Sequence, residues 1–202
     1  MQNQNSLQPL AACLNWFAAA ELASYAPEVS ESRDVFQGRL ERVVADPGVA
    51  RMDTQSLSLI LAVTGEIGNN CFDHNLGQWR DQPGCWFGLS STAESVVIWV
   101  ADRGQGFCST LRRVLPDIGS DQNAIEIAYE QVISGRYPER RGNGLKFVRN
   151  VINGNPDKGL YCCSGSGRLG FGGACGELET LAAGSGLSAG LGVFTVLQWR
   201  FP

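Results

Sequence analysis

The amino-acid sequence predicts an α+β fold in which helices and strands form separate layers. Up to about residue 75, apolar residues recur at the three- and four-residue spacing of amphipathic helices. From residue 85 onward, short runs rich in aromatic and β-branched residues, which are typical of strands, alternate with helical segments. Helices first, followed by strands mixed with helices, favour a layered α+β sandwich over a regular βαβ array.

Three helices are predicted in the first part of the chain. The first covers residues 7–25 and ends before Pro27. The second covers residues 31–45 and stops at the "DPG" turn of residues 46–48. The third is the long helix that follows Asp53, whose short carboxylate side chain suits the N-cap position.

The second part of the chain is predicted to contain a hairpin, two helices and two more strands. In chain order these are "CWFGLSS" and "SVVIWVAD" for the hairpin, "DQNAIEIAYEQVIS" and "RRGNGLKFVRNVI" for the helices, and "GLYCCSGSG" and "VFTVLQWRF" for the strands. A stretch rich in Gly, Ala and Ser near residues 170–192 separates the last two strands, and its composition predicts a mobile loop.

Composition narrows the functional classes. With 44% hydrophobic residues, 18% charged residues and a net charge of −4, the chain is globular and gives no support to nucleic acid as its main partner. Seven cysteines without a CxxC pair, together with a single histidine, give little basis for a zinc site. We therefore expect reduced thiols in a cytoplasmic protein.

The apolar run "PLAACLNWFAAAELASYA" near the N-terminus is not expected to be a signal peptide or a membrane span. No Lys or Arg precedes Arg33, so the basic region of a signal peptide is missing. Asn15 and Glu21 interrupt the apolar run. We interpret the run as a helix of a soluble protein that has no membrane partner.

The segment "TGEIGNNCFDHN", residues 64–75, combines a core stripe with a dense polar face. At about 100° per residue, the stripe consists of Ile60, Val63, Ile67 and Cys71. Glu66, Asn70 and Asp73 fall within about 60° of one another on the neighbouring face. One interpretation is a face that presents a carboxylate and an amide, one turn apart, to a ligand. The other is a polar face exposed to water.

Two glycine pairs follow this helix, "GQG" at residues 104–106 and "GNG" at residues 142–144. Neither fits the Rossmann or the P-loop pattern, and each alone is compatible with a tight turn. Their order after Glu66-x-x-x-Asn70 and Asp102 resembles the sequence boxes of the GHKL superfamily of ATPases (gyrase, heat-shock chaperone, histidine-kinase and mismatch-repair proteins). The resemblance covers roughly residues 55–202.

Within this superfamily, "GEIGNNCFDH" is most similar to the anti-sigma-factor kinases. The long stretch at 170–192 resembles the stand-alone bacterial ATP-binding proteins, in which the last hairpin is interrupted. The resemblance implies a Bergerat-type ATP-binding fold, a two-layer α/β sandwich with a mixed, mostly antiparallel sheet covered by helices on one face. It also implies an ATPase domain over residues 51–202, with an ATP lid at about 107–141 and a helical extension over residues 1–50.

The resemblance further implies a site for ATP or ADP with Mg²⁺. Asn70 corresponds to the asparagine whose side-chain oxygen contacts Mg²⁺. Glu66 corresponds to the residue that orients, or accepts a proton from, the attacking hydroxyl or water. Asp102 corresponds to the carboxylate that accepts a hydrogen bond from the exocyclic amine of adenine. Gly104 and Gly106 let the backbone approach the base without a Cβ in the way.

The phosphate contacts are expected at the start of the following helix. Gly142 and Gly144 free backbone N–H groups there, which favours phosphate binding. Leu145, Lys146 and Arg141 complete the predicted cofactor contacts. The basic residues of this stretch are Arg136, Arg140, Arg141, Lys146 and Arg149, and for most of them a solvated face is the alternative interpretation.

Two further positions, His74 and Gly192-Val193, bear on the predicted site. His74 matches a histidine of the anti-sigma-factor kinases, and as the only histidine of the chain it is either a hydrogen-bonded structural residue or a phosphoacceptor. We favour the structural role because His74 lies in the predicted nucleotide-site helix. Gly192-Val193 stands where these ATPases have Gly-Thr, so a hydroxyl contact to the nucleotide is expected to be missing.

The predicted function is that of a protein serine/threonine kinase or regulator that acts on a regulatory protein, such as an anti-sigma-antagonist or a sigma-like partner. The alternative is a nucleotide-sensing interaction module, or an ATPase partner subunit, with little or no phosphotransfer. The presence of Glu66 favours the kinase, because a pure binding protein needs no base. A homodimer is compatible with either function, and fold analogy alone does not choose between them.

Overall fold

The computed structural model describes residues 8–75, 77–130, 143–188 and 190–201. They include one six-stranded sheet with the order β1-β2-β3-β6-β4-β5. The strands are β1 (Val29–Ser30), β2 (Cys85–Ser91), β3 (Ser95–Asp102), β4 (Lys158–Gly165), β5 (Gly167–Phe171) and β6 (Gly190–Arg200). The α+β class is confirmed. The sheet was expected to be mixed but mostly antiparallel, and every pairing among the described strands is antiparallel.

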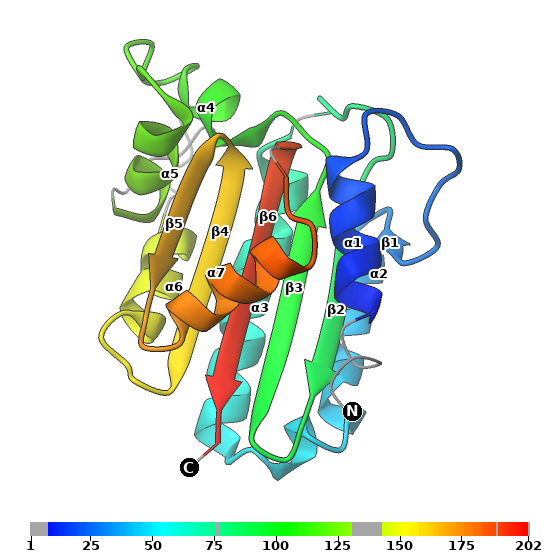
Figure 1. The fold of residues 1–202 in the computed structure, drawn as a ribbon, viewed down its shortest axis with the longest axis vertical. Helices are drawn as coiled ribbons and strands as arrows, with labels where there is room; N and C mark the ends of the chain where they lie inside the picture. The colour runs from blue at the N-terminus through cyan, green and yellow to red at the C-terminus, as the bar shows by residue number, and fades with distance from the viewer. Residues whose placement is uncertain (1–7, 76, 131–142, 189, 202) are drawn as a thin grey trace.

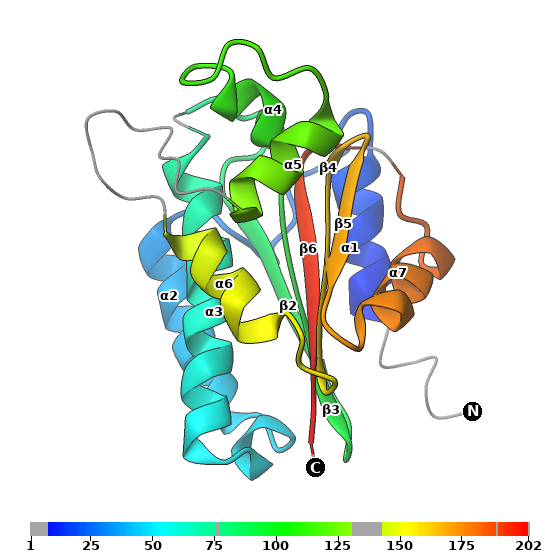
Figure 2. The same ribbon diagram turned by 90° about the vertical axis from the view of Figure 1, so that its left-hand side faces the viewer.

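Helices lie on both sides of the sheet. They are α1 (Gln8–Ala18), α2 (Arg33–Glu41), α3 (Thr54–Asp73), α4 (Gly106–Leu111), α5 (Asp121–Glu130), α6 (Gly144–Ile152) and α7 (Cys175–Gly184), with two 3₁₀ helices at Arg42–Ala45 and Val49–Arg51. Figure 2 shows α2, α3 and α6 on one side of the sheet, α1 and α7 on the other, and α4 and α5 at one end.

The long helix α3 forms the main helical layer against the sheet. Its predicted stripe is confirmed, since Ile60 and Val63 are fully buried and Ile67 and Cys71 are nearly so. These side chains share one core with apolar residues of the sheet and of α6. The predicted N-cap is also confirmed, because the Asp53 carboxylate accepts a hydrogen bond of 2.9 Å from the backbone N–H of Ser56.

The opposite face of the sheet carries a second apolar cluster. Trp86, Trp99 and Phe194 project from three adjacent strands and pack against α1 and α7. In Figure 1 these two helices lie in front of the sheet. The expected sandwich of a sheet and one helical layer is present, but the expectation of helices on one face alone is too narrow. Three large aromatic side chains on the other face also favour burial, and α1 and α7 provide it.

The stretch at residues 170–192 was wrongly predicted to be a mobile loop. It contains the end of β5, the helix α7 and the start of β6. Alanine is the strongest helix former, and Leu178 and Ala182, one turn apart, are buried against the sheet. Composition alone suggested a linker because the small residues that allow this close packing are also typical of linkers.

The N-terminal residues contribute to the helices on both faces of the sheet. The first predicted helix ends at Ala18 rather than at residue 25, and the second continues as a 3₁₀ helix to Ala45. Between these helices, β1 adds a short antiparallel strand beside β2. Among the described residues, no helix combines the length and the apolar character needed to cross a membrane.

Candidate functional site

A pocket opens where the end of α3 meets the ends of β3 and β6 and the helices α4 and α5. Its cavity volume is about 30 Å³. The lining is mostly apolar, with a few polar groups: its residues are Ile67, Asn70, Cys71, His74, Asn75, Val100, Asp102, Gly106, Phe107, Thr110, Tyr129, Leu145, Val193 and Thr195. Such a mixture is typical of small-molecule sites.

Asp102, the last residue of β3, is the buried carboxylate of this pocket, as predicted. It is 2% exposed. The backbone N–H of Gly104 and the side-chain amide of Asn75 both donate to Oδ1, at 2.8 and 3.1 Å. Burial raises the pKa of Asp102 to about 6, because desolvation outweighs the hydrogen bonds that favour the charged form. The pocket therefore holds a hydrogen-bond acceptor in surroundings of low polarity.

Asn75 positions this carboxylate, and sequence reasoning missed it. Its Nδ2 donates to Asp102 and to the carbonyl of Cys71, and its Oδ1 accepts from the N–H of Gln105 at 3.0 Å. The signal was the third side-chain amide of "TGEIGNNCFDHN", which lies two residues beyond Asp73, the end of the predicted polar face. A buried asparagine normally has all its hydrogen bonds satisfied, and Asn75 meets this rule.

The glycines after Asp102 permit this arrangement. A Cβ on Gly104 would lie 1.8 Å from Oδ1 of Asn75, so only glycine fits there. Gly106 starts α4 with φ at +74°, a backbone conformation that favours glycine. Gly106 lines the pocket, and the predicted approach of the backbone of both residues to the base stays a prediction.

The strand β6 brings a hydroxyl, that of Thr195, into the wall of the pocket, and the expected absence of a hydroxyl contact to the nucleotide stays a prediction. Val193 does occupy the threonine position of the resemblance, but Thr195, two residues further, lines the same pocket because side chains alternate along a strand. Thr195 Oγ1 donates to Sγ of Cys162 at 3.2 Å. The prediction considered only Val193, the residue after Gly192, and did not consider Thr195, the next residue of the strand that faces the pocket.

Asn70 and His74 lie on the pocket side of α3. Both line the pocket. His74 is the C-cap of the helix, and its backbone carbonyl accepts a hydrogen bond of 2.7 Å from Nε2 of Gln105. These contacts involve the backbone of His74, so the structural role that we favoured for its imidazole stays a prediction.

Asp73, of the predicted polar face, and Asn69, beside that face, contact α2. Asp73 forms an ion pair with Arg33, and Asn69 accepts a 3.0 Å hydrogen bond from Nε2 of Gln37. Part of this face is thus an interhelical contact, an arrangement that neither of the two interpretations anticipated.

Glu66 does not line the pocket. It is exposed and lies in a neighbouring open groove between α2 and α3, together with Gln37, Leu40, Glu41, Leu61, Ala62, Gly65 and Asn69. The structure nevertheless brings Glu66 to the start of α6, because a Cβ on Gly144 would lie 2.2 Å from its Oε2. Glu66 and Gly144, 78 positions apart in the sequence, therefore meet beside the mouth of the pocket.

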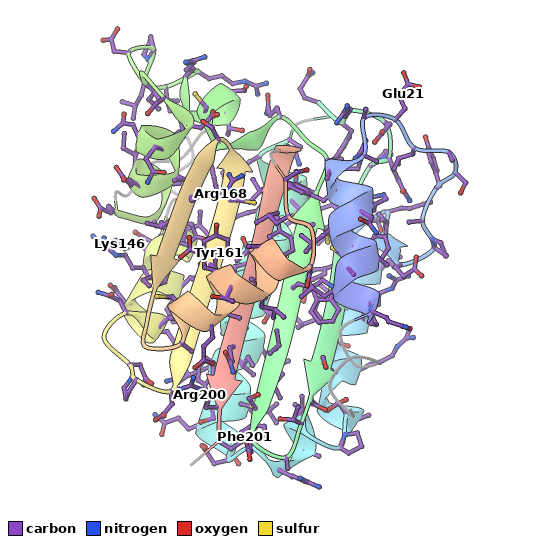
Figure 3. All side chains as sticks on the ribbon, in the orientation of Figure 1. Glu21, Lys146, Tyr161, Arg168, Arg200 and Phe201 are labelled. Carbon is purple, nitrogen blue, oxygen red and sulfur yellow. The ribbon has the colours of Figure 1, made fainter. Side chains whose placement is uncertain are left out.

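The predicted phosphate contacts are only partly described. Leu145 lines the pocket, whereas Lys146 is exposed on the outer side of α6 (Figure 3). Arg149 forms an ion pair of 3.0 Å with Glu130 of α5, which agrees with the alternative interpretation for this residue. Asn143 provides no side-chain capping bond to the start of α6. Arg136, Arg140, Arg141 and Gly142 lie outside the described residues.

Within the described part of the chain, no group of three or more His, Cys, Asp or Glu side chains is arranged to hold a metal ion. All seven cysteines are free thiols, as expected. The chain matches no protein-family model, and no curated protein matches it at a significant level.

Proposed function

We propose that this protein binds ATP or ADP with Mg²⁺ in the pocket between α3 and the ends of β3 and β6. The observation that carries the proposal is Asp102, a buried carboxylate whose Oδ1 is held by Gly104 and Asn75. The Cys71 thiol and the backbone N–H of Val193 also interact with this carboxylate. A carboxylate has about four acceptor sites, so it can still accept a hydrogen bond from the exocyclic amine of adenine. Guanine carries a carbonyl at that position, so acceptor would face acceptor.

The surroundings of Asp102 suit a flat base. Val100, Phe107 and Val193 line the pocket around the carboxylate, and apolar walls favour the faces of an aromatic ring. The GHKL-type order of the sequence motifs supports the same ligand.

The residues toward the mouth of the pocket fit a metal-bound phosphate chain. Asn70 offers a side-chain oxygen, and hard cations such as Mg²⁺ take few protein oxygens when they also bind phosphates. Bound Mg²⁺ would neutralise charge on the phosphates. Asn143 provides no side-chain cap to α6, and backbone N–H groups at the start of a helix favour a phosphate oxygen.

The position of Glu66 suggests which reaction the bound nucleotide undergoes. Its carboxylate lies beside the start of α6 and also in the open groove between α2 and α3. A hydroxyl of a partner protein that entered this groove would meet a base next to the phosphate site. We therefore propose a GHKL-type, cytoplasmic protein serine/threonine kinase or regulator of an anti-sigma-antagonist or sigma-like partner. A nucleotide sensor with little turnover, acting alone or as an ATPase partner subunit, is the second candidate, because Glu66 lies outside the pocket itself.

Titration calorimetry with ATP, in the presence and absence of Mg²⁺, tests the binding proposal. Asn70→Ala should weaken binding of Mg-ATP at least about tenfold and should matter less without Mg²⁺. Asn69→Ala is the matched control, because Asn69 makes its contact with α2 and should leave binding unchanged. If Asn70→Ala bound Mg-ATP like the parent protein, the metal assignment would be wrong; if the parent bound no ATP, the whole proposal would be.

A further inference from the structure

The base end of the pocket, the part around Asp102, contains a tyrosine that no motif predicted. Tyr129 comes from α5, is 0% exposed and lines the pocket. Its ring makes edge contacts with Phe107 and Phe171, at centroid distances of 6.3 and 5.4 Å. The two aromatic neighbours fix the ring, so the direction of its hydroxyl is set before any ligand arrives.

The hydroxyl of Tyr129 is buried without a hydrogen-bond partner among the residues that the structure describes. It lies near Thr195 and Cys162 but does not have hydrogen-bond geometry with either, and Thr195 directs its own hydroxyl to the Cys162 sulfur. An unsatisfied buried hydroxyl is unfavourable, and native proteins retain few of them. Such a group in the wall of a pocket indicates that a ligand supplies the missing partner.

The hydroxyl is able to donate at neutral pH. Burial, and to a lesser extent the neighbouring Cys162, raise the pKa of Tyr129 well above its usual value, so the proton stays on the oxygen. Asp102, in contrast, can only accept when ionised. The same pocket therefore offers an acceptor and a donor.

We propose that Tyr129 determines base specificity by donating a hydrogen bond to the ring nitrogen that flanks the exocyclic amine held by Asp102. The inference rests on the proposed function. In adenine the amine is a donor and the ring nitrogens on either side of it, N1 and N7, are acceptors. An acceptor from β3 and a donor from α5 therefore complement this edge of adenine, and α5 is part of the recognition of the base.

The hydroxyl contributes differently to the free and to the bound protein. In the free protein Tyr129→Phe removes an unsatisfied polar group and no hydrogen bond, so the melting temperature should stay unchanged or rise. In the complex the same substitution leaves a buried ring nitrogen without a donor, so ATP affinity should fall about 5- to 50-fold. A merely structural tyrosine would show the opposite pattern.

Calorimetry and thermal melting of the parent protein, Tyr129→Phe and Tyr161→Phe test the proposal. Tyr161 is a matched control, because it is buried on the opposite face of the sheet, on the side of α7 (Figure 3), and should not affect ATP binding. The expected result is a selective loss of ATP affinity in Tyr129→Phe. Equal affinity of the parent protein and Tyr129→Phe would overturn the assignment.

Two adenine analogues give a test that needs no variant. In one analogue of ATP carbon replaces N1, and in the other carbon replaces N7. The parent protein should bind one of the two, the analogue that lacks the nitrogen bonded by Tyr129, more weakly than ATP. Tyr129→Phe should bind that analogue and ATP with equal affinity. If the parent protein binds both analogues as tightly as ATP, the hydrogen bond from Tyr129 does not exist. If the parent protein binds no ATP at all, the proposed function fails before this test is reached.

Discussion

The two ends of the pocket are built in different ways. At the base end, Asp102, Asn75 and Arg103 are at most 4% exposed, and each is held by two or more hydrogen bonds to neighbouring residues. At the phosphate end, Glu66 and Lys146 are exposed, and the start of α6 lacks a side-chain cap. At the first end the carboxylate is already held in place in the free protein and the Tyr129 hydroxyl awaits a partner, whereas the polar groups of the second end are open to solvent.

The hydrogen-bonded arrangement at the base end continues through Arg103. It follows Asp102 directly and forms a two-point ion pair with Asp81. Its remaining nitrogen donates to the carbonyls of Trp16, Phe17 and Ala19, at the end of α1. A buried arginine with all three guanidinium nitrogens engaged fixes the backbone beside it. The N-terminal helix is thus attached directly behind the base site.

The difference indicates a division of roles. A site that is ordered in advance can distinguish ligands, because the wrong base leaves its fixed polar groups unpaired. An open site can act only after a phosphate, a metal ion or a partner completes it. We therefore expect substitutions at the base end to change which nucleotide binds, and substitutions at the phosphate end to change what happens to it.

The largest effect is expected at Glu66. If the protein transfers phosphate or hydrolyses ATP, Glu66→Gln should lower the rate by about 10²- to 10⁴-fold and leave ATP affinity within a few-fold, because the amide keeps the size and loses the basicity. Release of ADP in the presence of Mg²⁺ measures the rate. Glu41→Gln, in the same groove, is the control and should have little effect. If the parent protein releases no more ADP than Glu66→Gln, the sensor interpretation replaces the kinase.

A smaller effect is expected in the pH dependence of stability. The pKa of Asp102 is about 6 in the folded protein, above its ordinary value of 3.8, so the folded state binds the proton more tightly than the unfolded state. The resulting stabilisation is fully present below about pH 3.8 and is lost as the pH rises through about 6. At about 1.4 kcal/mol for each pH unit between these values, the loss is about 3 kcal/mol.

Urea unfolding of the parent protein and of Asp102→Asn between pH 3.5 and pH 7.5 measures this contribution. Asparagine does not titrate, so the difference in unfolding free energy between the two proteins should change by about 3 kcal/mol over the range. Asp81, whose pKa is lowered chiefly by its bonds to Arg103, titrates in both proteins and cancels from the difference. A constant difference would mean that Asp102 is not the buried, proton-binding group described above.

The sequence predicted the parts of the fold that depend on periodicity. The stripe of α3, the β2–β3 hairpin and the N-cap Asp53 follow from local patterns, and all three are confirmed. The helix α7 was missed because its packing against the sheet depends on Leu178 and Ala182 meeting side chains of distant strands. Residue composition within one segment does not contain that information.

The same limit applies to the pocket. Asn70, Asp102, Gly106 and Leu145 were predicted, and all line it. Asn75, Thr195 and Tyr129 were not, because each belongs to the pocket only through contacts between α3, β6 and α5. Glu66 was predicted to act with Asn70, yet a turn of helix separates the groove from the pocket, so side chains of the two residues line different cavities.

The most direct test of the account compares thermal stabilisation by ATP and by GTP in the parent protein and in Asp102→Asn. If the base end sets nucleotide choice, ATP should raise the melting temperature of the parent protein clearly more than GTP does. This difference corresponds to about 5- to 150-fold in affinity, the effect of leaving buried polar groups unpaired. Asp102→Asn, whose amide can both donate and accept, should lose most of this preference. Equal stabilisation of the parent protein by ATP and GTP would contradict the central claim.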